Sequence, residues 1–411
     1  MNHSHTLTKL NEKFSIRNGI ATTIILNISN NYFPLFAISV LGASNYQVGL
    51  ISSLPQFIGM FAMLIGSLII NRLEEKKKFT AFSFLSTRMF LLIMFLIIYI
   101  PADYRSWAFV LLVGLMNLPG SFANLSWQSF IGDIIPDERR SAFFSERNKI
   151  MTIIGMISTF TVGILLQLFN QNNALPFQLL FLVAFIFGTI EFRYLMKHKE
   201  PKKAVRQKKQ SKKLDLGLHV FKHKPFVYFL ICSLFFNFGW QMAWSLFNIY
   251  QIKYAGATAL WISLFTVANQ LAQIASYNWW GRMADKHSNA KMLILVSIGM
   301  GSTPFLTILS TNMVYLVFVN FSSGLFVSGT VLLLFNQLLE VTKEDNRTIC
   351  ISNYNILLAL IAFIAPQFGV FLLEQTSMNI AMTISSFIRG SSAIFFFFLF
   401  LFMKKRFLAR G

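Results

Sequence analysis

Long apolar runs separated by short polar segments make up most of the chain. A helix that crosses the hydrocarbon core of a bilayer needs roughly 20 apolar residues, because lipid offers no hydrogen-bond partner to the backbone. Twelve runs are of about this length: 16–40, 46–70, 79–100, 107–131, 150–169, 176–195, 226–250, 257–280, 292–309, 313–338, 349–373 and 379–403. The pattern predicts an all-α membrane protein with twelve transmembrane helices.

Composition supports lipid as the solvent of this chain. Of the 411 residues, 55% are hydrophobic and 13% are charged, which leaves too few ionisable groups to cover a water-exposed surface. The net charge of +20 does not indicate nucleic acid as a partner, because the basic residues form short clusters between apolar runs. Both cysteines, Cys232 and Cys350, lie inside apolar runs, and we interpret them as small apolar side chains.

The Lys and Arg residues predict the orientation of the helices. Basic loops stay on the cytosolic side of a membrane, whereas neutral loops cross it readily. Basic loops alternate here with nearly neutral ones, and their charges are Arg72 with Lys76 to Lys78, Arg139 with Arg140, Arg282 with Lys286 and Lys291, Lys343 with Arg347, and Lys404 to Arg406. Both termini are therefore predicted to be cytosolic.

A basic segment divides the chain into two halves. Residues 196–224 hold eleven Lys or Arg and two acidic residues, without an apolar stretch long enough to span a bilayer. We interpret them as a cytosolic linker between an N-terminal six-helix bundle, residues 1–195, and a C-terminal six-helix bundle with a short basic tail, residues 225–411. The charge of the linker favours an orientation signal and attraction to anionic lipid headgroups over a specific partner site.

Two loop motifs repeat between the halves. The chain reads Ser67-x-x-Ile70-Asn71-Arg72-x-x-x-x-Lys77 after the second helix and Gly281-x-x-Ala284-Asp285-Lys286-x-x-x-x-Lys291 after the eighth. Asp133 precedes Arg140 by seven residues after the fourth helix, and Glu340 precedes Arg347 by seven after the tenth. Corresponding loops in two sets of six helices indicate the internal duplication that is typical of secondary transporters.

These motifs resemble the major facilitator superfamily, whose signature loop is close to G-x-x-x-D-R/K-x-G-R/K-R/K. Gly281, Asp285, Lys286 and Lys291 match its best-kept positions, and the N-terminal copy carries Asn71 in place of the Asp. The resemblance covers nearly the whole chain in helix number and loop position. It implies two six-helix bundles that work by alternating access, with the loop motifs acting as a cytosolic gate.

A gating role for these loops has a physical basis. A Gly allows two helices to approach closely, and a carboxylate at a helix end can cap that helix or pair with a basic group of the other half. We expect Asp285 to act in this way, and the alternative is a plain cap or loop charge. Asp133 with Arg140, and Glu340 with Arg347, form either a charge relay beside the gate or solvated turns.

Polar side chains on two corresponding helices are the candidate substrate contacts. The resemblance implies that the first, fourth, seventh and tenth helices line the cavity. Thr23, Asn27 and Asn31 on one face of the first helix correspond, at an offset of 214 residues, to Asn237, Gln241 and Ser245 on one face of the seventh. A stripe of buried amides either joins helices or faces a wet cavity. We favour the cavity and select Asn27, Asn31, Asn237, Gln241, Trp244 and Asn248.

Two charges lie within predicted spans, Arg88 in the third helix and Arg389 in the twelfth. An arginine inside a bilayer needs a partner, water or a bound anion to offset its cost. The resemblance places both helices away from the cavity, so we favour structural hydrogen bonding over anion recognition. Every Asp and Glu is assigned to a loop, a tail or a helix end, so no membrane-embedded carboxylate is expected as a proton carrier.

The sequence thus favours a secondary transporter that moves a small organic solute by alternating access, with proton-coupled efflux as one option. No P-loop is present, all six His lie in predicted tails or loops, and we expect no enzymatic activity, catalytic residue, cofactor or metal. The alternative is a non-transporting sensor or lipid-handling protein on the same scaffold. We expect a monomer in a bacterial plasma membrane, with a small-molecule substrate and the lipid bilayer as its partners.

Overall fold

The computed structural model describes residues 2–70, 73, 75–200, 218–342 and 346–408, and this part of the chain is helical without strands. It divides into two compact units, Met1–Lys209 and Gln210–Gly411. Most of the predicted linker falls on residues 201–217, which lie outside the described residues. The all-α architecture agrees with the sequence prediction.

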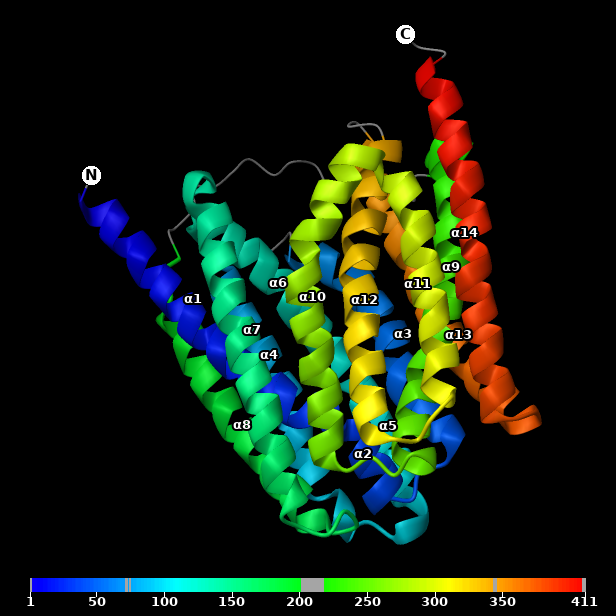
Figure 1. Cartoon of the computed structure of the whole chain (residues 1–411). Coiled ribbons are helices and arrows are strands. Elements are labelled where there is room, and N and C mark those ends of the chain that lie inside the picture. The colour runs from blue at the N-terminus through cyan, green and yellow to red at the C-terminus, as the bar shows by residue number, and fades with distance from the viewer. Residues whose placement is uncertain (1, 71–72, 74, 201–217, 343–345, 409–411) are drawn as a thin grey trace. The chain divides into compact units, whose positions relative to one another are not determined.

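Eight α-helices build the N-terminal unit (Figure 1). Their bounds are α1 Asn2–Ser29, α2 Phe33–Leu35, α3 Asn45–Ile70, α4 Lys76–Phe95, α5 Ala102–Leu115, α6 Asn117–Ile134, α7 Asp137–Gln167 and α8 Ala174–Lys197. Short helical segments join them: the 3-10 turns η1 Asn30–Tyr32 and η3 Ile97–Tyr99, and the π-helix η2 Phe36–Val40. α1 to η2 form the first span, and α5 with α6 form the fourth.

Six α-helices build the C-terminal unit. Their bounds are α9 Lys224–Ile249, α10 Ala259–His287, α11 Asn289–Ile308, α12 Met313–Val341, α13 Arg347–Gln375 and α14 Met378–Leu408. A 3-10 turn, η4 Leu218–Lys222, precedes α9, and a π-helix, η5 Tyr250–Tyr254, extends it. With the N-terminal unit this gives the twelve predicted spans.

Several helices are longer than the apolar runs that predicted them. Ten spans are long and apolar enough to cross a membrane, and the first span and α10 are the two exceptions. α10 carries Asn269, Gln270 and Gln273 along its length. α7 begins at Asp137, before the predicted Ile150, because its polar first turns continue the same helix beyond the apolar run. Hydropathy locates the lipid-buried part of a helix and not its ends.

The internal repeat continues through a structural detail that the sequence analysis missed. The π-helices Phe36–Val40 and Tyr250–Tyr254 lie 214 residues apart, the same offset as the first loop motif. Each is followed by a glycine with positive φ, Gly42 at 65° and Gly256 at 70°. Glycine adopts this left-handed conformation without steric cost and so ends both helices in the same way. The sequence signal was present in the matching segments 41–44 (LGAS) and 255–258 (AGAT).

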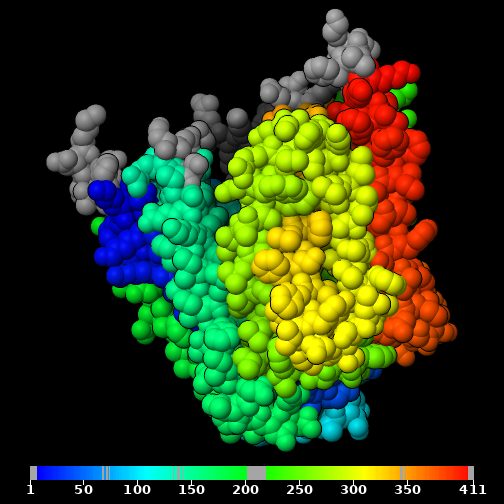
Figure 2. All heavy atoms as spheres, viewed as in Figure 1, coloured from blue at the N-terminus to red at the C-terminus, as the bar shows by residue number. Residues whose placement is uncertain are grey.

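Each unit is organised around one helix that packs on two others. α8 packs against α1 and α4 in the N-terminal unit, and α14 packs against α9 and α11 in the C-terminal unit (Figure 1). Figure 2 shows α12 between α10 and α11 on one face of the C-terminal unit, in agreement with their mutual packing. Because the lipid-facing surface is also apolar, polar side chains mark these junctions better than hydrophobicity does.

Candidate functional site

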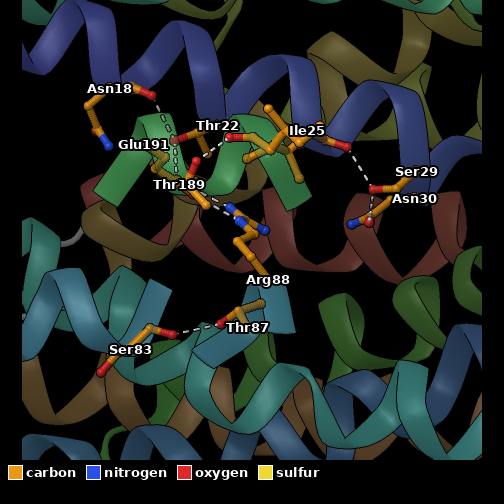
Figure 3. Close-up of polar contacts among 11 residues, drawn as sticks. Asn18, Thr22, Ile25, Ser29, Asn30, Ser83, Thr87, Arg88, Thr189 and Glu191 are labelled. Atoms are coloured by element: carbon orange, nitrogen blue, oxygen red, sulfur yellow. Dashed lines mark hydrogen bonds and ion pairs between the residues drawn. The ribbon is translucent and has the colours of Figure 1, made fainter. Parts of the chain in front are cut away.

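A buried ion pair occupies the junction of α1, α4 and α8 (Figure 3). Arg88 on α4 donates from Nε to Glu191 Oε2 at 2.8 Å and from Nη2 to Glu191 Oε1 at 3.2 Å. Thr22 on α1 donates its hydroxyl to Glu191 Oε1 at 2.5 Å. Arg88 is 3% exposed and Glu191 is 0% exposed. The pair thus links three helices and leaves no net charge in the junction.

The ion pair corrects one sequence expectation and supports another. Glu191 lies six residues before the end of α8 and is fully buried, so the assignment of every acidic residue to a loop, tail or helix end was wrong. The misassignment arose because Glu191 lies near the polar end of its apolar run. Arg88 bonds a carboxylate of the same unit, which agrees with the favoured structural role over recognition of a free anion.

Arg389 on α14 occupies the corresponding junction of the C-terminal unit and binds neutral acceptors. Its Nε donates to Gly239 O at 3.0 Å and its Nη2 to Trp240 O at 2.9 Å, both on α9. Its Nη1 donates to Met300 O at 3.2 Å and Thr303 Oγ1 at 3.1 Å on α11. The residue is 1% exposed. These bonds agree with the structural hydrogen bonding that the sequence favoured.

The polar stripe of the first helix packs in register against α7. Thr23 donates its hydroxyl to Met151 Sδ at 3.2 Å, and Asn31 Nδ2 donates to Thr159 Oγ1 at 3.1 Å, each pair 128 residues apart. Thr159 Oγ1 also donates to Asn27 Oδ1 at 2.9 Å. Two parallel helices therefore bond to each other along this face. Asn27 and Asn31 join helices, the alternative that the sequence analysis ranked second, and both remain partly exposed.

The corresponding stripe of α9 is less well satisfied. Asn237 donates from Nδ2 to Ser233 O at 2.8 Å, and Asn248 donates from Nδ2 to Trp244 O at 3.2 Å. Gln241 is 4% exposed, and its Oε1 has no hydrogen-bond partner among the described residues. The Trp244 indole is 36% exposed. The stripe therefore combines a buried amide lacking a partner with an accessible aromatic ring.

The N-terminal loop motif is described only in part. Asn71 and Arg72 lie outside the described residues, and the side chain of Ser67 is likewise not described. Lys77, in the first turn of α4, donates from Nζ to His198 O at 3.2 Å. The Glu200 carboxylate accepts from the backbone N–H groups of Lys76 and Lys77, each at 3.1 Å. This copy of the motif is therefore tied to the segment that follows α8.

The C-terminal loop motif lies at the end of α10 and the start of α11. Asp285, Lys286 and Lys291 are exposed, and Asp285 makes no hydrogen bond or ion pair in the part of the chain that the structure describes. Ser288, where the family signature has Gly, adopts φ 78° and ψ 150°. This conformation is nearly exclusive to glycine, so the serine strains the turn.

Within the C-terminal unit, Gly281 is not a point of close helix contact. A Cβ at Gly281 would meet only Leu332 Cδ2 at 3.9 Å, which is an ordinary contact. The close approach of α10 and α12 occurs instead at Gly324, where a Cβ would collide with the backbone oxygen of Asn269. The sequence motif contained a glycine, but only packing reveals which glycine a neighbouring helix touches.

The predicted charge relay is only partly visible. Arg140 donates from Nη2 to Gly132 O at 2.8 Å and Ile135 O at 3.3 Å at the end of α6, and the side chain of Asp133 is not described. The predicted ion pair of Glu340 with Arg347 does not form. Glu340 Oε2 accepts from Asn289 Nδ2 at 3.2 Å, and Arg347 Nε has no partner among the described residues.

A buried histidine at the end of α8 was not selected from the sequence. His198 Nδ1 lies 3.0 Å from Tyr194 O and 3.1 Å from Leu195 O, and the residue is 1% exposed. Burial lowers the pKa of its imidazole to about 4, so the ring is neutral at pH 7. Asn11 exchanges two hydrogen bonds with the backbone of Lys199. The segment 198–200 thus holds the ends of α1, α4 and α8 together.

The sequence also missed a basic residue inside α7. Arg147 precedes the fifth predicted apolar run, 150–169, and its guanidinium carbon Cζ lies 4.5 Å from the ring centroid of Trp127 on α6. Because α7 begins at Asp137, Arg147 lies within this helix and packs against its neighbours.

No cluster of three or more His, Cys, Asp or Glu side chains suited to a metal occurs in the described part of the chain.

The fold and these intramembrane polar junctions define a polytopic helical membrane protein with the architecture of solute transporters. The family model for the Major Facilitator Superfamily matches residues 18–268 and 229–409. The chain therefore belongs to the Major Facilitator Superfamily, as its loop motifs indicated. A search of curated proteins found no match.

Solved transporter structures share this fold at low sequence identity. A point mutant of the nucleoside transporter NupG is 11% identical, with a TM-score of 0.76 over 95% of this chain and 100% of its own. An inward-facing, occupied bacterial homologue of the human lysosomal transporter Spinster is 10% identical, with a TM-score of 0.71 over 96% of each chain. A D-xylose–proton symporter is 14% identical, with a TM-score of 0.67 over 95% of this chain and 97% of its own.

Proposed function

We propose that the chain is a secondary transporter that moves a small organic solute across the membrane by alternating access of its two halves. The observation that carries this proposal is the stripe on α9. Gln241 Oε1 and Ser245 Oγ are buried and have no hydrogen-bond partner among the described residues. Polar atoms in a membrane helix are costly unless water, a partner or a ligand satisfies them. A solute with hydrogen-bonding groups would satisfy them transiently.

The same stripe offers an apolar surface to a solute. Trp240 and Trp244 lie with ring centroids 6.2 Å apart and nearly perpendicular planes, and Trp244 is partly exposed. An exposed indole can cover a flat or apolar part of a small molecule. Gln241, Trp244 and Asn248 are therefore the proposed contacts of the C-terminal unit. Asn27 and Asn31 bond α1 to α7 but stay partly exposed, and they are the proposed contacts of the N-terminal unit.

We further propose that the protein resides in a bacterial plasma membrane as a monomer with both termini in the cytosol, where its basic linker meets anionic headgroups. The reaction is transport without covalent chemistry. Proton-coupled efflux is the mode to test first. Glu191 is not the expected proton carrier, because Arg88 and Thr22 already bind its carboxylate oxygens.

The gate is assigned to the loop motifs. Asp285 is exposed and lacks a partner within the described residues, so it is available to a basic group in one state of the transport cycle. Lys286, Lys291 and Lys77 are the basic residues of the two motifs that the structure describes. Asp133, Arg140, Glu340 and Arg347 are assigned to the turns that flank this gate.

The test compares solute levels in cells and medium for four strains: empty vector, wild type, Gln241→Leu and Asn172→Leu. Asn172 is an exposed loop amide and serves as the matched control. We expect a solute whose distribution shifts with wild type and Asn172→Leu but not with Gln241→Leu. Repeating the assay with Asp285→Asn tests the gate, and with a protonophore tests proton coupling. If no solute shifts while the protein is abundant in the membrane, a sensor or lipid-handling role replaces transport.

A further inference from the structure

The side chain of Arg147 on α7 lies against α1 and α6 and has no counter-charge among the described residues. Its guanidinium lies over Trp127 of α6, with the Arg147 carbon Cζ 4.5 Å from the ring centroid. On the other side is Gly19 of α1, where a Cβ would lie 2.7 Å from Arg147 Nη2. A larger residue at position 19 would therefore displace the guanidinium from this place. Arg147 is therefore held in position by packing and not by an acidic residue.

Four buried polar atoms, of Arg147, of Trp127 and of the part of α1 near Gly19, have no hydrogen-bond partner among the described residues. The Nε of Arg147 and the indole Nε1 of Trp127 are both buried without a hydrogen-bond acceptor among the described residues. On α1, Ser15 Oγ lies one turn before Gly19 and Asn18 Nδ2 directly beside it in the sequence, and neither has a partner in the described part of the chain. Ser15 is 0% exposed and Asn18 is 1% exposed. These four groups can all donate hydrogen bonds.

Three other arginines of the unit do have hydrogen-bonded partners. Arg88 binds Glu191, and Arg139, on the same helix as Arg147, binds Glu12 with Nε to Oε1 at 2.8 Å. Arg140 donates to backbone carbonyls at the end of α6. An arginine near the core of a membrane protein that lacks an acidic partner needs an anion or water to offset its desolvation.

The internal repeat supports the same conclusion. By the offset of the second loop motif, 207 residues, Arg147 corresponds to Tyr354 on α13, and by the offset of the first, Gly19 corresponds to Ser233 on α9. The Tyr354 hydroxyl interacts with Ser233 and Asn237 of α9. The C-terminal unit therefore fills this position with a neutral phenol that has protein partners. The N-terminal unit fills it with a cation that has no hydrogen-bond or ionic partner among the described residues.

We propose that Arg147 and Trp127 form an anion-binding subsite, and that the transported solute carries a carboxylate or phosphate group. This inference rests on the proposed transport function and specifies its substrate class. The guanidinium donates to the oxyanion in a charge-assisted pair, the indole N–H supplies a neutral donor, and Gly19 keeps the guanidinium against α1. An aromatic carboxylate would use both the charge and the ring surface.

Binding is measured on the full-length protein in nanodiscs of phosphatidylcholine, by quenching of tryptophan fluorescence with benzoate, citrate and inorganic phosphate. Benzamide is the neutral match for benzoate. We expect at least one anion to bind and benzamide not to, and we expect Arg147→Gln to weaken binding by tenfold or more. Gly19→Ala should weaken it too, since it displaces the guanidinium while keeping its charge. Arg139→Gln, which removes an arginine already paired with Glu12, should leave binding unchanged.

Arg147→Lys and an unfolding curve for each variant separate a binding defect from misfolding. Lysine keeps the charge but loses the fork of donors, so we expect intermediate affinity with an unchanged melting temperature. Equal binding by wild type and Arg147→Gln, or equal binding of benzoate and benzamide, overturns the subsite. A second set of nanodiscs with phosphatidylglycerol distinguishes the source of the oxyanion: if the lipid competes with the soluble anions at Arg147, a headgroup is the occupant and the substrate assignment falls.

Transport assays separate this inference from the proposed function. Efflux of a radiolabelled anion from proteoliposomes that depends on Arg147 supports both. Arg147-dependent binding without any flux supports the subsite and overturns transport of that anion class. Flux of a neutral solute that is unaffected by Arg147→Gln supports transport and overturns the anionic substrate.

Discussion

The two halves of the protein use opposite solutions to bury an arginine at equivalent three-helix junctions. In the N-terminal unit Arg88 extends from α4 to a carboxylate on α8, and the pair is neutral. In the C-terminal unit Arg389 extends from α14 to backbone oxygens of α9 and α11, and its charge stays unpaired within the described residues. Helix carbonyls accept a second hydrogen bond without losing the first, whereas a buried carboxylate requires its cation. The first junction should therefore be less tolerant of change than the second.

The largest effect is expected at the ion pair. Glu191→Gln leaves the Arg88 guanidinium buried without a counter-charge, which should lower the free energy of unfolding by about 3 to 5 kcal/mol. The double variant Arg88→Met with Glu191→Gln removes the stranded charge and should recover much of this loss. Thermal unfolding in detergent measures both. A single variant as stable as wild type would mean that water, not Glu191, compensates Arg88.

The second-largest difference between the two junctions is expected from adding a methyl group at a glycine of each. A Cβ at Gly301 would lie 2.8 Å from Cα and N of Gly390, which belong to the backbone of α14. A Cβ at Gly188 would lie 2.6 Å from Cγ of Arg88, which is a side-chain atom and not part of a helix backbone. We expect Gly301→Ala to cost about 2 to 3 kcal/mol and Gly188→Ala about 1 kcal/mol, because a helix backbone yields less easily. The reverse order of melting temperatures would contradict this comparison.

Replacing the second arginine should cost less than breaking the ion pair. Arg389→Gln removes charge-assisted bonds but leaves no buried ion, and Gly239 O, Trp240 O and Met300 O belong to helices that already supply hydrogen bonds. We expect a loss of about 2 kcal/mol in unfolding free energy. Arg389→Lys is the matched variant, since a single ammonium cannot reach both α9 and α11. If Arg389→Gln proves more damaging than Glu191→Gln, the ranking of the junctions is wrong.

Acidification should affect the N-terminal unit through His198. Its folded pKa of about 4 lies below the unfolded value of 6.5, so the unfolded chain binds the proton first and stability falls as the pH drops below 6.5. Between pH 7 and pH 5 the loss should be about 1 to 2 kcal/mol. His198→Asn should reduce this pH dependence relative to wild type. Parallel unfolding curves for both proteins across this range would exclude His198 as the origin.

The smallest effect is expected in the C-terminal loop motif. Ser288→Gly relieves a backbone conformation that glycine adopts freely, and should stabilise the protein by about 1 kcal/mol. Ser310→Gly, in the loop after α11, is the control without a positive φ and should give no gain. A melting temperature that stays constant or falls with Ser288→Gly would show that the loop relaxes without strain.

The number of spans and the repeat could be predicted because both depend on local patterns. The length and hydrophobicity of each apolar run predict a membrane-spanning helix without reference to the other runs. The offset of 214 residues follows from comparing the two loop motifs in the sequence. The partner of a buried polar side chain could not be predicted in this way. Arg88 and Glu191 lie 103 residues apart, and nothing in either run names the other. Gly281 and Gly324 are likewise both glycines in the sequence. Only the packing of α10 against α12 shows that Gly324 is the residue at the helix contact.

A twelve-helix membrane protein of the Major Facilitator Superfamily, built from two related halves, could be predicted from the amino-acid sequence. Hydrophobicity and motif spacing are properties of consecutive residues, so they can be read without a structure. Only the packed helices show which polar groups satisfy one another: Glu191 bonds Arg88, Arg389 bonds carbonyls of two helices, and Arg147 has no hydrogen-bonded partner among the described residues. In lipid each such pairing depends on which helix faces meet, because hydrophobicity no longer separates the inside from the outside of the bundle.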